Sequence, residues 1–198
     1  MNGQVEDRPG EHVRIASPDE VLAGIERIGV GRDRPVVVLV GGAGGMEERD
    51  LRVLAEVMRG AVVPAVVRHG AVVVDGGTDS GVMRLIGRAR SAEGADFPLV
   101  GVAAEGTVTL PGAAPPCADA AELEPNHTGF LLAPGSAWGD EAPWITSVAA
   151  AIAGRRASVT VLANGGEIAY TDVNGSLAHG RPVVVLAGSG RTDRKSVV

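Results

Sequence analysis

The residues best suited to bind an anion stand directly after four valine-rich runs. The runs and the turns that follow them are VVVLVGGAGGM (36–46), AVVVDGGTDSG (71–81), VTVLANGG (159–166) and VVVLAGSGR (183–191). Glycine lets the backbone approach an anion without an intervening Cβ. The N-terminus of a following helix adds unpaired N–H groups and a partial positive charge, and the hydroxyls of Thr78 and Ser80 add donors. These turns therefore predict phosphate binding, although strand-to-helix turns also use glycine for geometry alone.

A site of this kind requires a sheet that brings the four turns to one edge. Apolar runs of about five residues are typical of strands buried on both faces of a parallel sheet. Further strands are predicted at 12–16, 98–104 and 129–133, and helical spacing occurs at 17–28, 51–58, 82–89 and 145–152. Because strand and helix alternate, we predict an α/β fold, an open sheet of mostly parallel strands with helices on both faces. Ligands of such sheets bind beyond the carboxyl ends of the strands, where all four turns fall.

Length and charge narrow the class of protein. The 198 residues predict one domain, in which residues 1–33 form an N-terminal strand and helix extension and residues 192–198 form a tail. A net charge of −6, without blocks of like charge, disfavours nucleic acid as a partner. The N-terminus lacks the basic and apolar regions of a signal peptide, and no apolar stretch approaches the roughly 20 residues that span a bilayer. The single cysteine, Cys117, excludes an internal disulfide. We expect a cytoplasmic protein with no membrane segment.

Several common cofactor and catalytic motifs are missing. The only lysine, Lys195, is three residues from the C-terminus, which disfavours a Walker-type phosphate loop and pyridoxal phosphate chemistry. Gly42 and Gly44 begin a dinucleotide fingerprint, but Glu47 replaces its third glycine, so nicotinamide dehydrogenase chemistry is disfavoured. The histidines lack zinc-ligand spacing and no GxSxG motif is present, so we expect no metal and no obligatory cofactor. Asp75, at the end of its strand, either binds a ribose or accepts N–H bonds from the following turn.

Two further features each leave two interpretations open. Residues 109–127 are rich in proline and alanine and too long for an ordinary connection, which predicts either a lid or a surface loop without function. Trp138 and Trp144 bracket the sequence WGDEAPW. Trp138 is either a surface on which a nucleobase stacks or, as is more common, a half-buried core residue.

Five segments of the sequence, taken in their order along the chain, resemble the SLOG superfamily. They are DGGTDSGVM (75–83), PNHTGFLL (125–132), WGDE (138–141), VLANGGEIAYTDV (161–173) and HGRPVVVLAGSGRTD (179–193). The resemblance is to the branch formed by the cytosolic N-terminal domain of melastatin-type TRP channels and its free-standing prokaryotic relatives, and it runs from about Val36 to Asp193. It implies a Rossmann-like domain that binds or senses a nucleotide-derived ligand, with ADP-ribose and other NAD-derived molecules as the leading candidates.

Carried over onto this sequence, the resemblance agrees with the glycine turns. It implies phosphates near Gly76, Gly77 and Thr78 and near Gly165 and Gly166, with residues 126–128 and Arg191 lining the same cleft. The full set of candidate ligand-binding residues is Gly41, Gly42, Gly76, Gly77, Thr78, Asp79, Ser80, Asn126, His127, Thr128, Gly165, Gly166, Glu167, Gly188, Ser189, Gly190 and Arg191.

The same superfamily implies an alternative that is an enzyme. Its Lonely-guy type phosphoribohydrolases cleave the base from nucleoside monophosphates and carry the motif PGGxGTxxE, whose glutamate is catalytic. In this sequence the two glycines are Gly165 and Gly166, but Ile168 and Ala169 replace the Gly-Thr pair and Asp172 replaces the glutamate. The alternative is therefore an N-glycoside hydrolase with Asp172 or Glu141 as its acid, although these departures make a binding protein without chemistry the first expectation.

Association with other proteins is left open by the sequence. A third hypothesis is a scaffold or oligomerisation module in which the glycine turns are only geometric. A homo-oligomer and an effector protein are both compatible with the sequence, and neither is identified by it. A nucleotide remains the partner that the residues favour.

Overall fold

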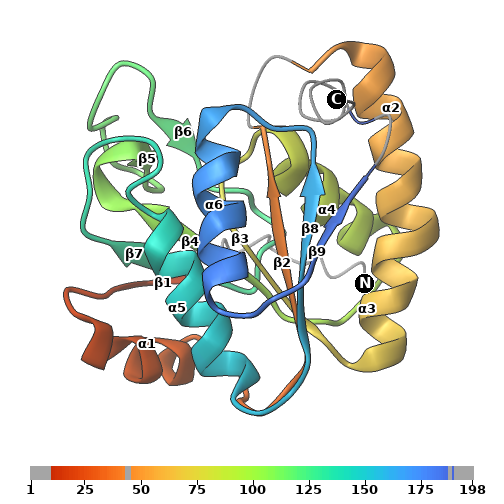
Figure 1. The fold of residues 1–198 in the computed structure, drawn as a ribbon. Coiled ribbons are helices and arrows are strands. Elements are labelled where there is room, and N and C mark those ends of the chain that lie inside the picture. Colours follow the sequence, from red (N-terminus) through yellow and green to blue (C-terminus); the bar gives the residue numbers. More distant parts are fainter. Residues whose placement is uncertain (1–9, 43–45, 187–188, 190–198) are drawn as a thin grey trace, which may run out of the picture.

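The computed structural model describes residues 10–42, 46–186 and 189, and these residues form a layered α/β domain (Figure 1). Its main sheet contains β1 (Glu11–Arg14), β2 (Val36–Gly41), β3 (Val72–Asp75), β4 (Leu99–Ala104), β7 (Gly129–Ala133), β8 (Ser158–Ala163) and β9 (Val183–Val185). The order across the sheet is β1-β7-β4-β3-β2-β8-β9, and every neighbouring pair is parallel. The fold class predicted from the sequence, a Rossmann-like open parallel sheet, is confirmed.

Helices cover both faces of the sheet, as the alternation of strand and helix predicted (Figure 1). One face carries α1 (Val21–Arg27), α5 (Ala142–Ala153) and α6 (Glu167–Ala178), and the other carries α2 (Glu48–Val57), α3 (Val63–His69) and α4 (Gly81–Ala92). Short 3-10 turns lie at Pro18–Glu20 (η1) and Glu105–Thr107 (η3). None of the helices in the described part of the chain is both long and apolar enough to cross a membrane.

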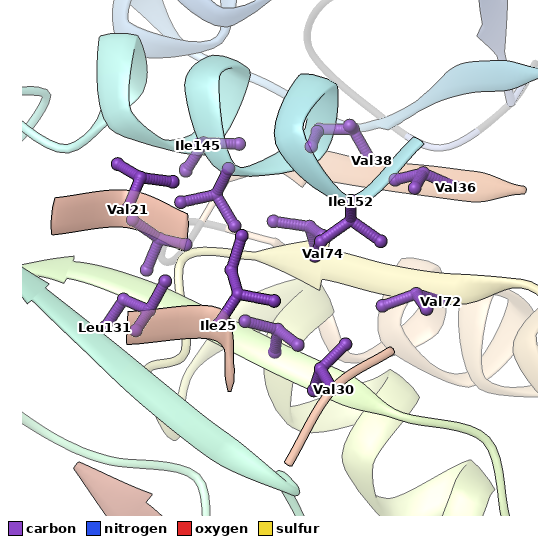
Figure 2. Close-up of a cluster of buried hydrophobic side chains, with 14 of the residues drawn as sticks. Val21, Ile25, Val30, Val36, Val38, Val72, Val74, Leu131, Ile145 and Ile152 are labelled. Carbon is purple, nitrogen blue, oxygen red and sulfur yellow. The ribbon is translucent and has the colours of Figure 1, made fainter. Parts of the chain in front are cut away.

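The valine runs form strands because their side chains pack on both faces at once. In β2 and β3, Val36, Val38, Val72 and Val74 point toward the α1 and α5 face, where they meet Ile145 and Ile152 of α5 (Figure 2). The alternate residues Leu39 and Val73 belong to the core under α2, α3 and α4. Each central strand therefore buries both sets of side chains, which removes the polar positions that an exposed face would require.

The position of the site follows from the strand order. From β2 the chain proceeds through β3, β4 and β7 on one side and then returns to β8 on the other side of β2. The helix after β2 lies on one face and the helix after β8 lies on the opposite face. A reversal of this kind opens a crevice between the carboxyl ends of the two strands, where α/β proteins bind their ligands.

Two elements differ from what the sequence patterns predicted. The helix expected at 51–58 continues through a π-helical turn, Met58–Val62 (η2), into α3. Pro64 lies directly after this π-helical turn, where the regular ladder of helix hydrogen bonds is already interrupted. The segment 109–127 is not structureless, since Val108–Thr109 (β5) pairs in parallel with Ala121–Glu122 (β6).

The strand and helix expected within residues 1–33 are present as β1 and α1, and β1 joins the sheet through β7.

Candidate functional site

A cavity of about 340 Å³ lies at the carboxyl ends of the central strands. Eight residues proposed from the sequence line it: Gly41 at the end of β2 and Gly42 after it, Gly76 and Thr78 after β3, Gly165 and Gly166 after β8, Glu141 beside α5 and Asp172 on α6. The cavity volume falls within the range of about 300–1,000 Å³ that is typical of ligand sites. Glycine turns from three strands thus meet at one place, on both sides of the crevice between β2 and β8.

Two of these glycines face open space. Among the described residues, a Cβ built on Gly166 would meet no atom within 4 Å, and a Cβ on Gly76 would meet only the end of Met83, at 3.9 Å. Both residues line the cavity. Their lack of a side chain therefore leaves space in the cavity and serves no tight contact within the described part of the protein.

Gly77 has a different role from the one proposed for it. Its φ of +70° is a backbone conformation that favours glycine, and a Cβ there would lie 2.8 Å from Gly101 and 3.0 Å from the Phe130 ring. Its N–H donates to Oδ1 of Asp75 at 2.7 Å. The N–H is therefore committed to the turn, and the space beside its Cα is filled by the core, so Gly77 serves the geometry of the turn. Of the two interpretations of Asp75, the structure supports the acceptor of a turn N–H.

Gly41 is also tightly packed, although it lines the cavity. A Cβ on Gly41 would clash with the carbonyl oxygen of Ala163 in the neighbouring strand and with the methyl groups of Val82. This glycine allows β2, β8 and α4 to approach one another. It contributes backbone to the cavity wall, and its missing side chain serves packing.

The N-terminus of α6 opens onto the cavity. Gly166 is the N-cap residue of this 12-residue helix and has no side chain with which to cap it. Asn164, two residues before Gly166, has a left-handed φ of 53°. Its N–H donates to the buried hydroxyl of Ser189 at 2.8 Å. The turn is thereby held in a conformation that presents the start of the helix, and its partial positive charge, to the cavity.

Two carboxyl groups, Glu141 and Asp172, line the cavity and interact electrostatically. Burial raises the pKa of Asp172, and the charge of Glu141 adds to this effect, so that the pKa is about 7. Burial also raises the pKa of Glu141, although the N–H of Gly139 donates to its Oε2 at 2.9 Å. Near neutral pH Asp172 is therefore present in both its protonated and its ionised form. Such a pair can bind hydroxyl groups or exchange a proton with a substrate.

His127 lies in the core beside the turn after β3 and does not line the cavity. Its Nδ1 is 2.8 Å from Oε2 of Glu124 and its Nε2 is 2.9 Å from Oδ1 of Asp75. Burial alone would lower the pKa of His127, but the two carboxylates outweigh burial and raise it to about 9. At neutral pH the ring is a buried cation that donates on both sides. The ring also stacks on Phe130, with 5.2 Å between the ring centres.

The neighbours of His127 are likewise committed to contacts within the protein. Asn126 donates from its backbone N and its Nδ2 to Glu124, and the Thr128 hydroxyl accepts the N–H of Leu99 at 3.0 Å. Residues 126–128 were expected to line the ligand cleft, and the structure does not bring them to the cavity. The physical reason is that their polar groups bind Glu124 and β4, behind the turn that carries Gly76.

The remaining proposed residues lie beside the cavity or outside the described residues. Asp79 pairs with Nε of Arg84 at 2.7 Å, and the Ser80 hydroxyl lies 2.9 Å from that of Thr78. The hydroxyl of Ser189 is taken by Asn164. The side chain of Glu167 and all of Gly188, Gly190 and Arg191 lie outside the described part of the chain.

Among the cavity residues that were not proposed as ligand contacts, two carry polar side chains. Asn164 lines the cavity, and its place directly before Gly165 is a signal that could have identified it. Thr107 lines the cavity from η3, and no pattern in the sequence distinguishes it. Trp138, for which two interpretations were open, lines the cavity from the loop between β7 and α5.

Comparisons with known proteins agree with this architecture. The family model described as "SLOG in TRPM, prokaryote" matches residues 34–196. The X-ray structure of TM1055, a structural genomics target, superposes with a TM-score of 0.56 at 22% identity and covers 83% of this chain and 81% of its own. The molybdenum cofactor binding protein from the phototrophic bacterium Rippkaea orientalis superposes with a TM-score of 0.54 at 13% identity, with coverage of 77% and 76%. No curated protein sequence matches the chain significantly.

Proposed function

Since this chain belongs to the prokaryotic SLOG family related to TRPM channels, we propose that it binds a nucleotide-derived ligand of the ADP-ribose type in the cavity between β2 and β8. One observation carries the proposal. Glycine turns from β2, β3 and β8 meet the open N-terminus of α6 at the point where the strand order reverses. This arrangement is suited to an anionic group that is bound by backbone N–H groups.

The charges around the cavity suggest how such a ligand is oriented. The described residues that line the cavity include no lysine or arginine, so phosphate recognition there depends on backbone N–H groups and the dipole of α6. Glu141 and Asp172 would repel a phosphate but accept hydrogen bonds from hydroxyl groups. We therefore assign phosphate to the turns around Gly76 and Gly166 and the ribose to the carboxyl pair.

A thermal-shift and calorimetric screen tests the proposal. The ligands are AMP, ADP-ribose, cyclic ADP-ribose and NAD, with adenosine as the control that lacks phosphate. A ligand at 100 times its dissociation constant stabilises the native state by about 2.7 kcal/mol, which gives a clear rise in melting temperature. Stabilisation by the phosphorylated ligands, and much less by adenosine, is the expected result. If none of the nucleotides stabilises the protein, the proposal is wrong and the scaffold interpretation is favoured.

A second candidate function is hydrolysis of an N-glycosidic bond. The observation that favours it is the pKa of about 7 at Asp172, with Glu141 beside it in the same cavity. One carboxylate would accept a proton from water as the water attacks C1′ of the ribose, and the protonated acid would give its proton to the departing base. Chromatography of the nucleotide after prolonged incubation distinguishes this activity from binding alone.

A further inference from the structure

We propose that Trp138 is the surface on which the heteroaromatic base of the ligand stacks, so that the base lies at the β4 and β7 end of the cavity. This inference rests on the proposed function and adds to it the direction in which the nucleotide lies. The two tryptophans of the chain occupy different environments. Both are half-buried, but Trp144 packs against the core cluster under α1 and α5, whereas Trp138 lines the cavity.

The two ends of the cavity differ in chemistry. At the end formed by β4 and the loop after β7, the lining includes Ala103, Ala104, Trp138 and, from α5, Ile145, together with the polar residues Thr107 and Glu141. At the other end, after β2 and β8, it includes the glycine turns and the start of α6. The order β4-β3-β2-β8, at about 4.8 Å per strand, separates the two ends by roughly 14 Å. An extended ligand with an apolar ring at one end and phosphate at the other matches this arrangement.

The Trp138 ring is held in place by polar contacts that point away from its faces. Its indole N–H donates to Oδ2 of Asp119 at 2.9 Å. Oδ1 of the same carboxylate accepts a hydrogen bond from the thiol of Cys117 at 3.2 Å. The loop that carries Trp138 is also fixed, because Asp140 accepts the N–H groups of Ser136 and Ala137, both at 3.0 Å. A ring whose position is already fixed loses little freedom when a base stacks on it.

These contacts give a function to part of the segment 109–127. Asp119 belongs to this segment, and the pairing of β5 with β6 holds the ends of the excursion together. The segment thus supports the aromatic wall of the cavity from outside. Asp119 is a positioning residue in this proposal, since it acts on the ligand through Trp138.

Intrinsic fluorescence tests the inference directly, because the chain has only two tryptophans. In the variant Trp144→Phe, all tryptophan fluorescence comes from Trp138. We expect AMP and ADP-ribose to quench this fluorescence with saturation. Ribose 5-phosphate, which has the phosphate and sugar but no base, should bind more weakly in calorimetry and should not quench.

Variants of Trp138 separate stacking from other roles. Trp138→Ala should weaken AMP binding by about tenfold or more, because the base loses its stacking partner, and should leave ribose 5-phosphate binding unchanged. Trp138→Phe should retain most of the affinity for AMP. Asp119→Ala should give an intermediate loss that is specific to AMP, and Asp119→Asn, which keeps an acceptor oxygen, should resemble the unmodified protein.

The outcomes distinguish this inference from the proposed function. If AMP binds to the unmodified protein and to Trp138→Ala with equal affinity, stacking is wrong and nucleotide binding remains. If Trp138→Ala and Asp119→Ala weaken AMP and ribose 5-phosphate equally, the tryptophan only supports the cavity and the inference is also wrong. If neither AMP, ADP-ribose nor ribose 5-phosphate binds, the proposed function fails and this inference fails with it. If Trp138→Ala does not fold, the affinities of Asp119→Ala and Asp119→Asn for AMP and ribose 5-phosphate still test the stacking. A loss in Asp119→Ala that is specific to AMP supports it, and an equal loss for both ligands contradicts it.

Discussion

His127 and Asp75 form a fully buried ion pair, with 2.9 Å between Nε2 of the histidine and Oδ1 of the aspartate. The same carboxylate oxygen accepts the N–H of Gly77, and the carbonyl of Gly77 accepts the N–H of Glu124. The pair thus fixes the turn after β3, on which Gly76 and Thr78 line the cavity. A residue that touches no ligand in the proposed site thereby sets the geometry of that site.

Removal of the histidine cation should destabilise the fold strongly. In His127→Gln two buried carboxylates lose the positive charge between them, and we expect a loss of about 3–5 kcal/mol in the free energy of unfolding. Urea denaturation followed by circular dichroism measures the change. His12→Gln is the matched control, since His12 is exposed on the edge strand β1, and it should change stability by less than about 0.5 kcal/mol. Equal stability of His127→Gln and the unmodified protein would contradict the ion pair.

The contribution of His127 should depend on pH in a defined window. Its pKa of about 9 in the folded state lies above the value of about 6.5 expected in the unfolded chain. The folded state therefore binds the proton more tightly, and its stabilising effect is fully present below about pH 6.5 and lost as the pH rises through 9. Denaturation of the unmodified protein and of His127→Gln between pH 6 and 10 should show a stability difference that shrinks with rising pH. A constant difference would mean that the ring does not titrate in this range.

Gly166→Val should weaken nucleotide binding and leave the domain folded. The backbone of Gly166 has φ −112°, which valine adopts readily, and the new side chain would enter open space at the start of α6. We expect AMP affinity to fall by at least about tenfold in calorimetry, which corresponds to about 1.4 kcal/mol or more. Gly31→Val, at an uncrowded position outside the cavity, is the control and should bind normally. Normal binding by Gly166→Val would place the phosphate elsewhere.

Adjacent glycines after β3 should respond in opposite ways to a side chain. Gly77→Val meets both a left-handed backbone and the Phe130 ring, so we expect a destabilisation of about 2–6 kcal/mol or failure to fold. Gly76→Ala has space for its methyl group and should cost less than about 1 kcal/mol. Thermal denaturation of the two variants under identical conditions makes the comparison. If the valine at position 77 is tolerated, the turn is not held as described.

We expect the domain to bind nucleotides without releasing a free base from AMP. Ile168 and Ala169 replace the Gly-Thr pair of the related hydrolase motif, and Asp172 is one methylene shorter than its glutamate. A catalytic acid that lies too far from the bond loses most of its effect. Chromatography after overnight incubation is the measurement. Base release that disappears in Asp172→Asn would establish the hydrolase instead and would assign Asp172 as its acid.

The strands could be predicted from the sequence because their cause is local. Continuous valine runs indicate burial on both faces, and each predicted strand lies close to an observed one. Helix α6 was not among the predicted helices, since Thr171, Asn174 and Gly175 are weak helix formers and the packing of α6 against α5 and the sheet stabilises it. Burial by distant elements is not visible in a local pattern.

The sequence predicted which turns form the cavity, but it did not predict which residues of each turn face it. Gly76 and Gly77 are indistinguishable in sequence, and only the backbone path shows that one faces the cavity and the other faces Phe130. The PNHT motif identified His127 as important without showing where it acts. Its function depends on Asp75, which lies 52 positions earlier in the chain and which no spacing rule connects to it.

The pairing of β1 with β7 has a consequence for how the protein is made. Residues Glu11–Arg14 find their partners only at 129–132, and no described strand of the main sheet pairs with its neighbour through a hairpin. At roughly 5–20 residues per second, a ribosome needs about 6 to 24 seconds to proceed from Arg14 to Leu132. During this interval β1 lacks the strand with which it pairs in the sheet. The nascent chain is therefore expected to be a client of chaperones that shield exposed apolar segments until β7 emerges.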